Sequence, residues 1–441
     1  MSYRENNIIQ INERDLINLI ESNAHDLHKS LDPLMDRIGK APIVMLGEAS
    51  HGTHEYYMWR ARISRRLIEE KDFNIIGVEG DWPDCYRINR YIRNYDDTEN
   101  TAFEVLKEFN RWPTWMWANW EIQALMEWLK KHNQRKTHDR QTGFYGLDVY
   151  SLWESLEAIT DYLRTNDPDA LKAAEHAMQC FEPYGKEGAE YGSASRFVPE
   201  SCQEEVLDLL KTIRARVPLY DSDPEAPFNA EQNAMTAVNA EKYYRAMMEG
   251  GPESWNIRDV HMTETLERLL DFHGEGAKAI VWEHNTHIGD ARATDMSRGG
   301  MVNVGQLARE KWGRSDTVLI GFGSHRGSVI AARAWDDKMQ EMEVPPAREN
   351  SWEDLLNRSE PTDKIIINQD IKDSPLLKNP INHRAIGVVY DPDREYYGNY
   401  VPSIMPDRYD AFVFIDESRA LHPIKTATKS DMTPETYPWG I

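Results

Sequence analysis

Two acid–base side chains stand close together in the segment 47–52, GEASHG, immediately after a short apolar run. Glu48 and His51 are three positions apart in this segment, and a glycine precedes and follows the pair. A neutral imidazole that is oriented by a carboxylate can remove a proton from water, and the activated water can then attack an ester carbonyl. The spacing therefore makes His51 a candidate general base, with Glu48 or a second carboxylate as its orienting partner.

Further acids, histidines and one arginine follow other short apolar runs of the chain. A solvated surface is rich in lysine and glutamate, so this set is unlike an ordinary exposed face. Several carboxylates beside several histidines would also move pKa values apart, which favours one acid and one base at neutral pH. Candidate catalytic residues of this set are Glu79, His284 and His287, and candidate substrate-binding residues are Asp148, His325 and Arg326.

The elements that must position these groups alternate along the chain. Runs of strand length at 41–47 and 74–80 each precede a segment of helical periodicity, at 54–70 and from 81 onward. This alternation indicates an α/β fold with a mostly parallel central sheet flanked by helices. In such sheets, ligands bind in the crevice outside the carboxyl ends of the strands. The sequence therefore predicts one cleft to which five strands deliver their polar residues.

The remaining strands and the domain boundaries follow from the same pattern. We expect a helix over 13–38, and we expect strands at 142–150, 277–287, 316–327, 364–369, 383–391 and 410–416. Residues 1–150 and 276–343 are expected to form the α/β core that holds the cleft. Residues 151–275 are periodic near 3.6 and predict a helical insertion or cap. Residues 344–441 are expected to form a smaller α+β appendage.

Composition restricts the classes of partner. The 441 residues carry a formal net charge of −23, which disfavours nucleic acid and anionic membranes as partners. No stretch has the length and apolar character of a membrane span, and the N-terminal residues do not resemble a signal peptide. Cys85, Cys180 and Cys202 form neither a CxxC nor a zinc pattern, so we expect reduced thiols in a cytoplasmic protein. The expected partner is a small-molecule substrate.

The same sequence is compatible with other chemistries. Ser50 and Ser324 lack the G-x-S-x-G elbow, which disfavours a serine nucleophile. His284 and His287 could join carboxylates in a zinc, manganese or iron site, so a metal-dependent hydrolase is the main alternative to a reaction without metal or cofactor. A protein that only binds iron, haem or polysaccharide is a further alternative. His54 begins a helix and is expected to be structural.

Four motifs together resemble the erythromycin esterase family in order and spacing over roughly residues 40–330. They are GEASHG at 47–52, VEGDW at 78–82, GFYGLD at 143–148 and WEHNTHIGD at 282–290. The resemblance implies an α/β core with a helical insertion and a smaller additional domain. It also implies a hydrolase that opens ester or lactone bonds without an obligatory metal.

The resemblance also implies roles for individual residues. His51 matches the histidine that activates water, Glu48 and Glu79 match active-site glutamates, and the histidines at 284 and 287 match a pair in the family. Arg60 matches an active-site arginine, although the sequence by itself places it on a solvated helix. Resistance members of the family act on macrolide antibiotics, whereas others are labelled as succinoglycan biosynthesis proteins. The resemblance therefore supports ester hydrolysis better than it supports a macrolide substrate.

Overall fold

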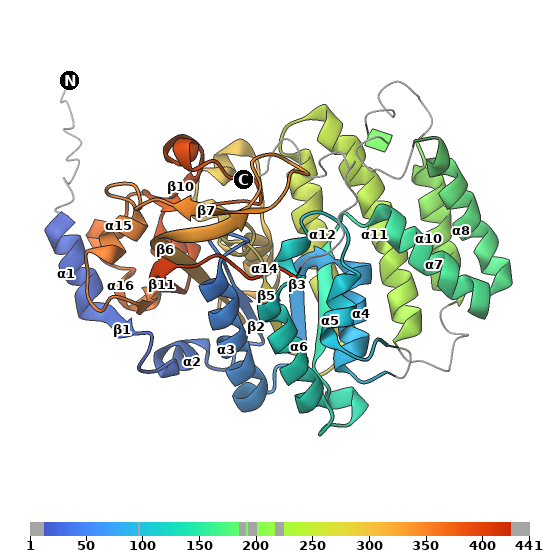
Figure 1. Ribbon diagram of the computed structural model, residues 1–441, viewed down its shortest axis with the longest axis horizontal. Coiled ribbons are helices and arrows are strands. Elements are labelled where there is room, and N and C mark those ends of the chain that lie inside the picture. Colours follow the sequence, from blue (N-terminus) through green and yellow to red (C-terminus); the bar gives the residue numbers. More distant parts are fainter. Residues whose placement is uncertain (1–12, 96–97, 185–190, 193–200, 217–224, 425–441) are drawn as a thin grey trace, which may run out of the picture.

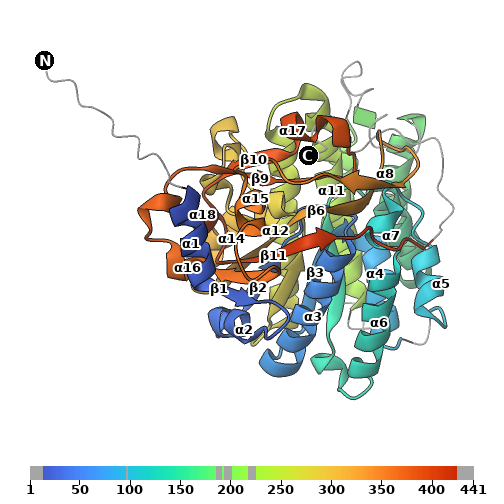
Figure 2. The same ribbon diagram turned by 60° about the vertical axis from the view of Figure 1, so that its left-hand side comes forward.

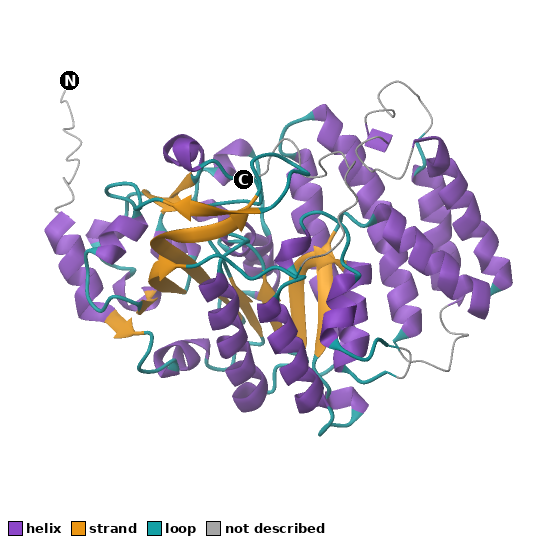
Figure 3. Ribbon diagram, viewed as in Figure 1, coloured by secondary structure: helices purple, strands orange, loops and turns teal. Residues whose placement is uncertain are grey.

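The computed structural model describes residues 13–95, 98–184, 191–192, 201–216 and 225–424. Its largest sheet contains the strands β1 (Ala24–Asp26), β2 (Ile43–Leu46), β3 (Ile75–Asp81), β4 (Gly143–Asp148), β5 (Ala279–Trp282), β6 (Thr317–Ala331), β7 (Gln340–Val344), β8 (Lys364–Ile367) and β11 (Ala411–Ser418). Neighbouring strands follow the order β1-β8-β11-β6-β2-β5-β3-β4, and β7 pairs with β6. Figure 3 shows these strands as a layer between helices.

Most of this sheet is parallel. The path β11-β6-β2-β5-β3-β4 contains only parallel pairs, whereas β8 is antiparallel to β11 and β7 is antiparallel to β6. All residues of β2, β4 and β5 are buried, as expected for parallel strands that are covered on both faces. The predicted fold class, a mostly parallel α/β sheet flanked by helices, is confirmed.

Alternate residues of β2 enter two different hydrophobic cores. Val44 and Leu46 pack in the core that contains apolar residues of α3 (His54–Lys71), α4 (Trp82–Ile92) and α6 (Trp120–Asn133). Ile43 and Met45 pack in the core that contains residues of α12 (Glu253–His273), α14 (Val304–Trp312) and α15 (Trp352–Asn357). Figures 1 and 2 show α3 and α6 lying along one face of the strands. The period of two along β2 is therefore what holds helices against both faces.

The chain between β4 and β5 forms a group of helices with a core of its own. These helices are α7 (Leu152–Asn166), α8 (Pro168–Phe181), α10 (Gln203–Arg216) and α11 (Ala226–Glu249), and they lie at one end of the molecule in Figure 1. The next helix, α12, returns to the sheet, where Met262, Leu266 and Leu269 join the core beneath β5. The segment expected as a cap therefore also supplies a helix that covers the sheet.

A disulfide bond joins Cys180, at the end of α8, to Cys202, just before α10. The expectation of three reduced thiols is wrong for this pair, because the packing of α8 against α10 brings residues 22 positions apart in sequence into bonding distance. Cys85, on α4, is a free thiol that is buried in the core. None of the described helices combines the length with the apolar character that crossing a membrane requires.

Three further elements differ from expectation. The segment 13–38 is interrupted, since α1 (Glu13–Asn23) and α2 (Asp32–Ile38) are separated by β1, which pairs with β8. The strand expected over 277–287 ends at Trp282 and is followed by the short helix α13 (Asn285–Ile288). The described part of the segment expected as an appendage, residues 344–424, does not stand apart from the core, because it contributes β8 and β11 to the main sheet.

The same C-terminal segment also forms a small second sheet. It contains β9 (Ile381–Arg384) and β10 (Tyr400–Ser403), which are antiparallel. The remaining α-helices that the structure describes in full are short: α5 (Ala102–Lys107), α16 (Asn368–Ile371), α17 (Glu395–Gly398) and α18 (Met405–Arg408).

Candidate active site

Three buried side chains, two on the loop after β2 and one on α3, are linked by hydrogen bonds. His51 donates a hydrogen bond from Nδ1 to Oε1 of Glu48 at 3.0 Å, and Arg60 on α3 donates from Nη2 to Oε2 of the same carboxylate at 2.7 Å. Arg60 is fully buried, and its guanidinium also stacks on the rings of Tyr57 and Trp282. Both carboxylate oxygens of Glu48 are therefore engaged, which fixes the plane of the His51 ring.

Two glycines allow this loop to fold closely against its neighbours. A Cβ atom on Gly47 would lie 2.1 Å from Oδ1 of Asn285, and one on Gly52 would lie 1.9 Å from the carbonyl oxygen of Ile330. The carbonyl of Glu48 accepts a hydrogen bond from the backbone N–H of Asn285 at 2.8 Å. The loop that carries Glu48 is thus tied to the segment that follows β5.

His284 and His287 lie at α13, directly after β5. His284 is the N-cap of this helix, and its Nδ1 accepts from the backbone N–H of Thr286 at 3.3 Å. An Nδ1 that accepts leaves the proton on Nε2, and this Nε2 has no hydrogen-bond partner among the described residues. The rings of His51 and His284 lie 4.9 Å apart between centroids. An unused N–H donor therefore lies beside the candidate base.

Glu79 connects the end of β3 to the same cluster. Its Oε2 accepts from the backbone N–H of His284 at 2.8 Å, and its Oε1 accepts from Nη2 of Arg258 at 2.7 Å. Arg258 also binds Asp148, at the end of β4, through Nε at 2.9 Å and Nη2 at 2.7 Å. Glu79 and Asp148 therefore meet on a single guanidinium, as bidentate Arg–carboxylate geometry favours.

The second histidine of α13 is held by residues of α12. Its Nδ1 donates to the carboxylate of Asp259 at 2.9 Å, and its Nε2 accepts from Nη1 of Arg258 at 3.1 Å. The ring of His287 stacks on Trp255 at 4.5 Å between centroids, with the planes 8° apart. These contacts fix the tautomer of His287 in the way that a carboxylate partner usually does.

The charges of the cluster favour the protonated form of His51. Burial alone lowers the pKa of this imidazole, but the charge of Glu79 and the hydrogen bond and charge of Glu48 outweigh burial, so the pKa is raised from its ordinary value of 6.5. Burial acts on Glu79 in the opposite direction, yet the charges of His287, His51 and Arg258 hold its pKa well below its usual range. Glu79 is therefore ionised at neutral pH.

Two other groups of the cluster are held neutral. Burial, joined by the charge of His51, lowers the pKa of His284 well below its ordinary value. Burial and the charge of Glu79 raise the pKa of Glu283 well above its ordinary value, and neither oxygen of Glu283 has a hydrogen-bond partner among the described residues. The neighbouring imidazoles of His51 and His284 thus have pKa values shifted in opposite directions, so His284 stays a neutral hydrogen-bond donor beside His51.

The structure brings seven of the nine expected site residues together and separates the other two. Arg326 is exposed, with a guanidinium 3.8 Å from Glu417, and the charged groups around His325 are Asp416, Arg384, Asp354 and Arg326 rather than members of the cluster. The reason lies in β6, which does not end at the sheet edge. Its Ile320 pairs with Leu46, the last residue of β2, and the strand continues to Ala331.

Sequence reasoning missed three members of the cluster, and all three lie on α12. Trp255, Arg258 and Asp259 belong to a helix that carries many charged residues, and their spacing resembles that of an ordinary solvated face. The only signal in the sequence is the adjacent pair of opposite charges at 258 and 259. The physical cause of their burial is the return of α12 to the sheet, which a pattern within the helix does not reveal.

Comparisons with known proteins identify the family of the chain. The sequence profile of the erythromycin esterase family matches residues 68–418. The chain is 23% identical over 330 residues to erythromycin esterase type II of Escherichia coli. This match covers 69% of this chain and 74% of that protein.

Solved structures share the fold along most of the chain. The crystal structure of a succinoglycan biosynthesis protein matches with a TM-score of 0.74 at 20% identity, covering 94% of this chain and 99% of that one. A mutant of erythromycin esterase EreC in its open conformation matches with a TM-score of 0.64 at 16% identity, covering 91% and 96%. Since the family profile extends over well more than half of its residues, the chain belongs to the erythromycin esterase family.

Proposed function

We propose that the protein hydrolyses carboxylic esters or lactones with water that His51 activates. Membership of the family supports a hydrolase, and the arrangement of Arg60, Glu48 and His51 supports the choice of base. Because Nδ1–H of His51 is committed to Glu48, Nε2 is the unprotonated nitrogen of the neutral ring, and its lone pair can accept a proton from water. This orientation of the imidazole is the observation that carries the proposal.

The reaction that follows from this orientation is a direct hydrolysis. Nε2 of His51 takes a proton from water while the water oxygen bonds to the carbonyl carbon, and the carbonyl oxygen becomes an oxyanion. Nε2–H of His284 donates a hydrogen bond to that oxyanion. Collapse of the tetrahedral intermediate breaks the ester C–O bond, and the imidazolium of His51 returns its proton to the departing alkoxide. The negative charges of Glu48 and Glu79 stabilise this imidazolium.

We favour a reaction without metal at this cluster over the metal-dependent alternative. The carboxylates that a divalent ion would need are already neutralised, because Arg60 binds Glu48 and Arg258 binds both Glu79 and Asp148. A cation placed among them would face two buried guanidinium groups. Like charges at short distance in a buried site are strongly unfavourable.

The substrate class follows from the chemistry of the cluster and from the named relatives. Esters and lactones share the carbonyl that the mechanism attacks, and the relative from Escherichia coli is named an erythromycin esterase. We propose macrolide lactones as one class to be tested beside simple aryl esters. A protein that only binds iron, haem or polysaccharide would turn over none of these compounds, so the same panel of substrates separates the alternatives.

The substitution His51→Asn tests the proposed base. Asparagine keeps a donor near the position of Nδ1, which preserves the contact with Glu48, but it removes Nε2. We expect kcat for an aryl ester to fall about 100- to 10,000-fold, the range for loss of a general base. The measurement is initial-rate kinetics on wild type and variant, with melting temperatures compared to show that both are folded. Wild-type turnover in a folded His51→Asn protein would contradict the mechanism.

A further inference from the structure

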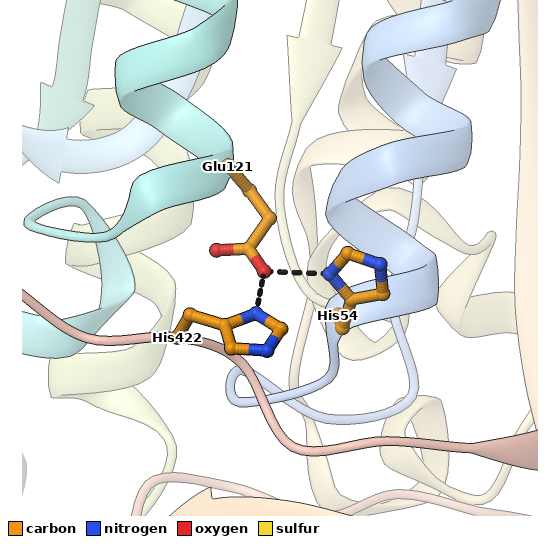
Figure 4. A group of neighbouring side chains, drawn as sticks. All are labelled: His54, Glu121 and His422. Atoms are coloured by element: carbon orange, nitrogen blue, oxygen red, sulfur yellow. Dashed lines mark hydrogen bonds and ion pairs between the residues drawn. The ribbon is translucent and has the colours of Figure 1, made fainter.

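A second group of ligand-type side chains meets at the starts of α3 and α6. His54 is the first residue of α3, Glu121 lies in the first turn of α6, and His422 follows β11. Figure 4 shows both imidazoles turned toward one carboxylate oxygen, with Nδ1 of each histidine 2.6 Å from Oε1 of Glu121. One nitrogen of each ring and one carboxylate oxygen all lie within 4.8 Å of one another.

The partner set of Glu121 is incomplete without a further ligand. The carboxylate is 7% exposed, and Oε2 has no hydrogen-bond partner in the part of the chain that the structure describes. A buried polar atom without a partner is rare in folded proteins and calls for a cause. Two imidazoles and one carboxylate form the mixed N/O donor set that zinc and related divalent transition metals bind.

We propose that His54, Glu121 and His422 bind a divalent transition metal ion of the zinc class. Coordination through Nδ1 requires only that the proton of each neutral ring moves to Nε2. Both rings have room for this, since the side chains of His54 and His422 are 21% and 59% exposed and Nε2 can face water. The nitrogen lone pairs of both rings then face the carboxylate of Glu121, whose unpartnered Oε2 can bind the ion beside Oε1.

The distances need to change little to admit the ion. Zinc–nitrogen distances of about 2.0–2.1 Å place two tetrahedral ligand atoms roughly 3.3 Å apart. The two Nδ1–Oε1 distances are 2.6 Å, so each has to lengthen by roughly 0.7 Å, and the ligand nitrogens of the two rings lie within 4.8 Å of each other. The side chain of His422 is mostly exposed and can adjust. The three side chains also line a surface pocket of about 390 Å³, which leaves the remaining coordination positions to water.

An ion at this place would fasten three distant parts of the chain. The segment with His422 already crosses the starts of α3 and α6 through backbone hydrogen bonds from His54 to Arg419, from Leu421 to Gly52 and from Trp120 to His422. Gly52 follows His51 directly. The ion would therefore clamp the C-terminal segment against the loop that carries the candidate base. Since this geometry exists only in the folded chain, binding would stabilise the fold.

Zinc chloride titration of the metal-free full chain, without any histidine tag, tests the proposal. By calorimetry we expect one equivalent of zinc per chain and a melting temperature that rises with zinc. Glu121→Gln and His422→Gln should each weaken binding at least about tenfold, because each removes a ligand. His422→Gln changes an exposed side chain, so it keeps the experiment valid even if Glu121→Gln folds poorly. His176→Gln, which alters an exposed histidine on α8, should bind zinc like wild type.

Two results would overturn the proposal. The first is the absence of stoichiometric zinc binding, or unchanged binding in both His422→Gln and Glu121→Gln. The second is loss of the zinc in His287→Gln with retention in His422→Gln, which would place the ion at the acid–base cluster. The proposal does not rest on the ester hydrolase, because its readouts are stoichiometry and melting temperature rather than turnover.

Discussion

At the scale of single residues, the negative charge of Glu79 sets the pH at which His51 can act. His51 is a base only when neutral, and its pKa is raised above 6.5 by the charges of Glu79 and Glu48 after burial has acted against them. We therefore expect kcat/KM for an aryl ester to fall as pH decreases, with the midpoint of this acid limb above pH 6.5. The pH profile of wild type between pH 5 and 9 measures this midpoint.

The substitution Glu79→Gln isolates the origin of the shift. Removing the negative charge of Glu79 makes the imidazolium of His51 less stable, so the pKa of His51 decreases and the acid limb moves to lower pH. This shift is expected whether or not the maximum kcat/KM also changes. Arg258 keeps Asp148 as a partner in this variant. Asp161→Asn, a change in an exposed ion pair on α7, is the control and should leave the limb in place. An acid limb that does not move in Glu79→Gln would contradict the coupling.

His284 offers a test of the oxyanion contact. Asparagine retains an acceptor that can cap α13, as Nδ1 of His284 does, but it has no donor at the position of Nε2. We expect His284→Asn to lower kcat by about 100- to 1,000-fold, the usual cost of one oxyanion donor. Glutamine places an amide nearer to Nε2, so His284→Gln should lose less. Equal losses in the two variants, or a change in KM alone, would count against this role.

At the scale of elements, the loop between β2 and α3 depends on the absence of a side chain at Gly52. A Cβ added to Gly52 would lie 1.9 Å from the carbonyl oxygen of Ile330. The backbone N–H of Ile330 also donates a hydrogen bond to the carbonyl of Gly52 at 3.0 Å. We expect Gly52→Ala to push β6 and the loop apart, to destabilise the fold by about 1–3 kcal/mol and to lower kcat, because His51 precedes this residue.

Urea unfolding and kinetics on the aryl ester check this expectation. Gly398→Ala is the matched control, since an added Cβ at Gly398 has nothing within 4 Å and should change neither quantity. A Gly52→Ala protein with wild-type stability and turnover would mean that the loop has more room than the close contact implies.

The elements differ in how far the sequence could predict them. The apolar runs that became β2, β3 and β4 were recognisable because buried parallel strands need continuous apolar residues. The end of β5 was misjudged, because His284 to His287 follow an apolar run but form a helical turn. The sequence predicts that the strand over 316–327 ends at the sheet edge, but β6 passes Ile320, where its pairing with β2 ends, and continues to Ala331. Nothing in TVLIGFGSHRG marks the point where that pairing stops. That difference removed His325 and Arg326 from the cluster.

At the scale of the whole molecule, the site depends on contacts that no local pattern encodes. Glu48, Glu79, Asp148 and His284 could be grouped from the sequence because adjacent parallel strands deliver them to one edge. Arg258 and Asp259 could not, because only the packing of α12 on the sheet carries them there. The disulfide between Cys180 and Cys202 likewise follows from the pairing of α8 with α10. Arg60 could be assigned only through the family resemblance.

A buried network fastens the helical group to the sheet. Glu225, just before α11, is 1% exposed and accepts hydrogen bonds from Nη1 of Arg93 at 2.7 Å, from the hydroxyls of Tyr145 and Tyr95 at 2.6 and 2.9 Å, and from Asn89 at 3.1 Å. These partners come from β4, α4 and the residues just after α4. A carboxylate with so many donors holds two parts of the chain in one relative position.

We expect Glu225→Ala to destabilise the protein by about 3–5 kcal/mol, because it leaves the guanidinium of Arg93 buried beside no counter-charge. Replacing both partners, as in Arg93→Met with Glu225→Met, should recover much of this loss, since an apolar pair needs no compensation. Urea unfolding measures both effects. Asp161→Ala breaks an exposed pair with Arg164 and should cost no more than about 1 kcal/mol. If Glu225→Ala were no more destabilising than Asp161→Ala, the attachment would have to come from the apolar contacts of α11 and α12 instead.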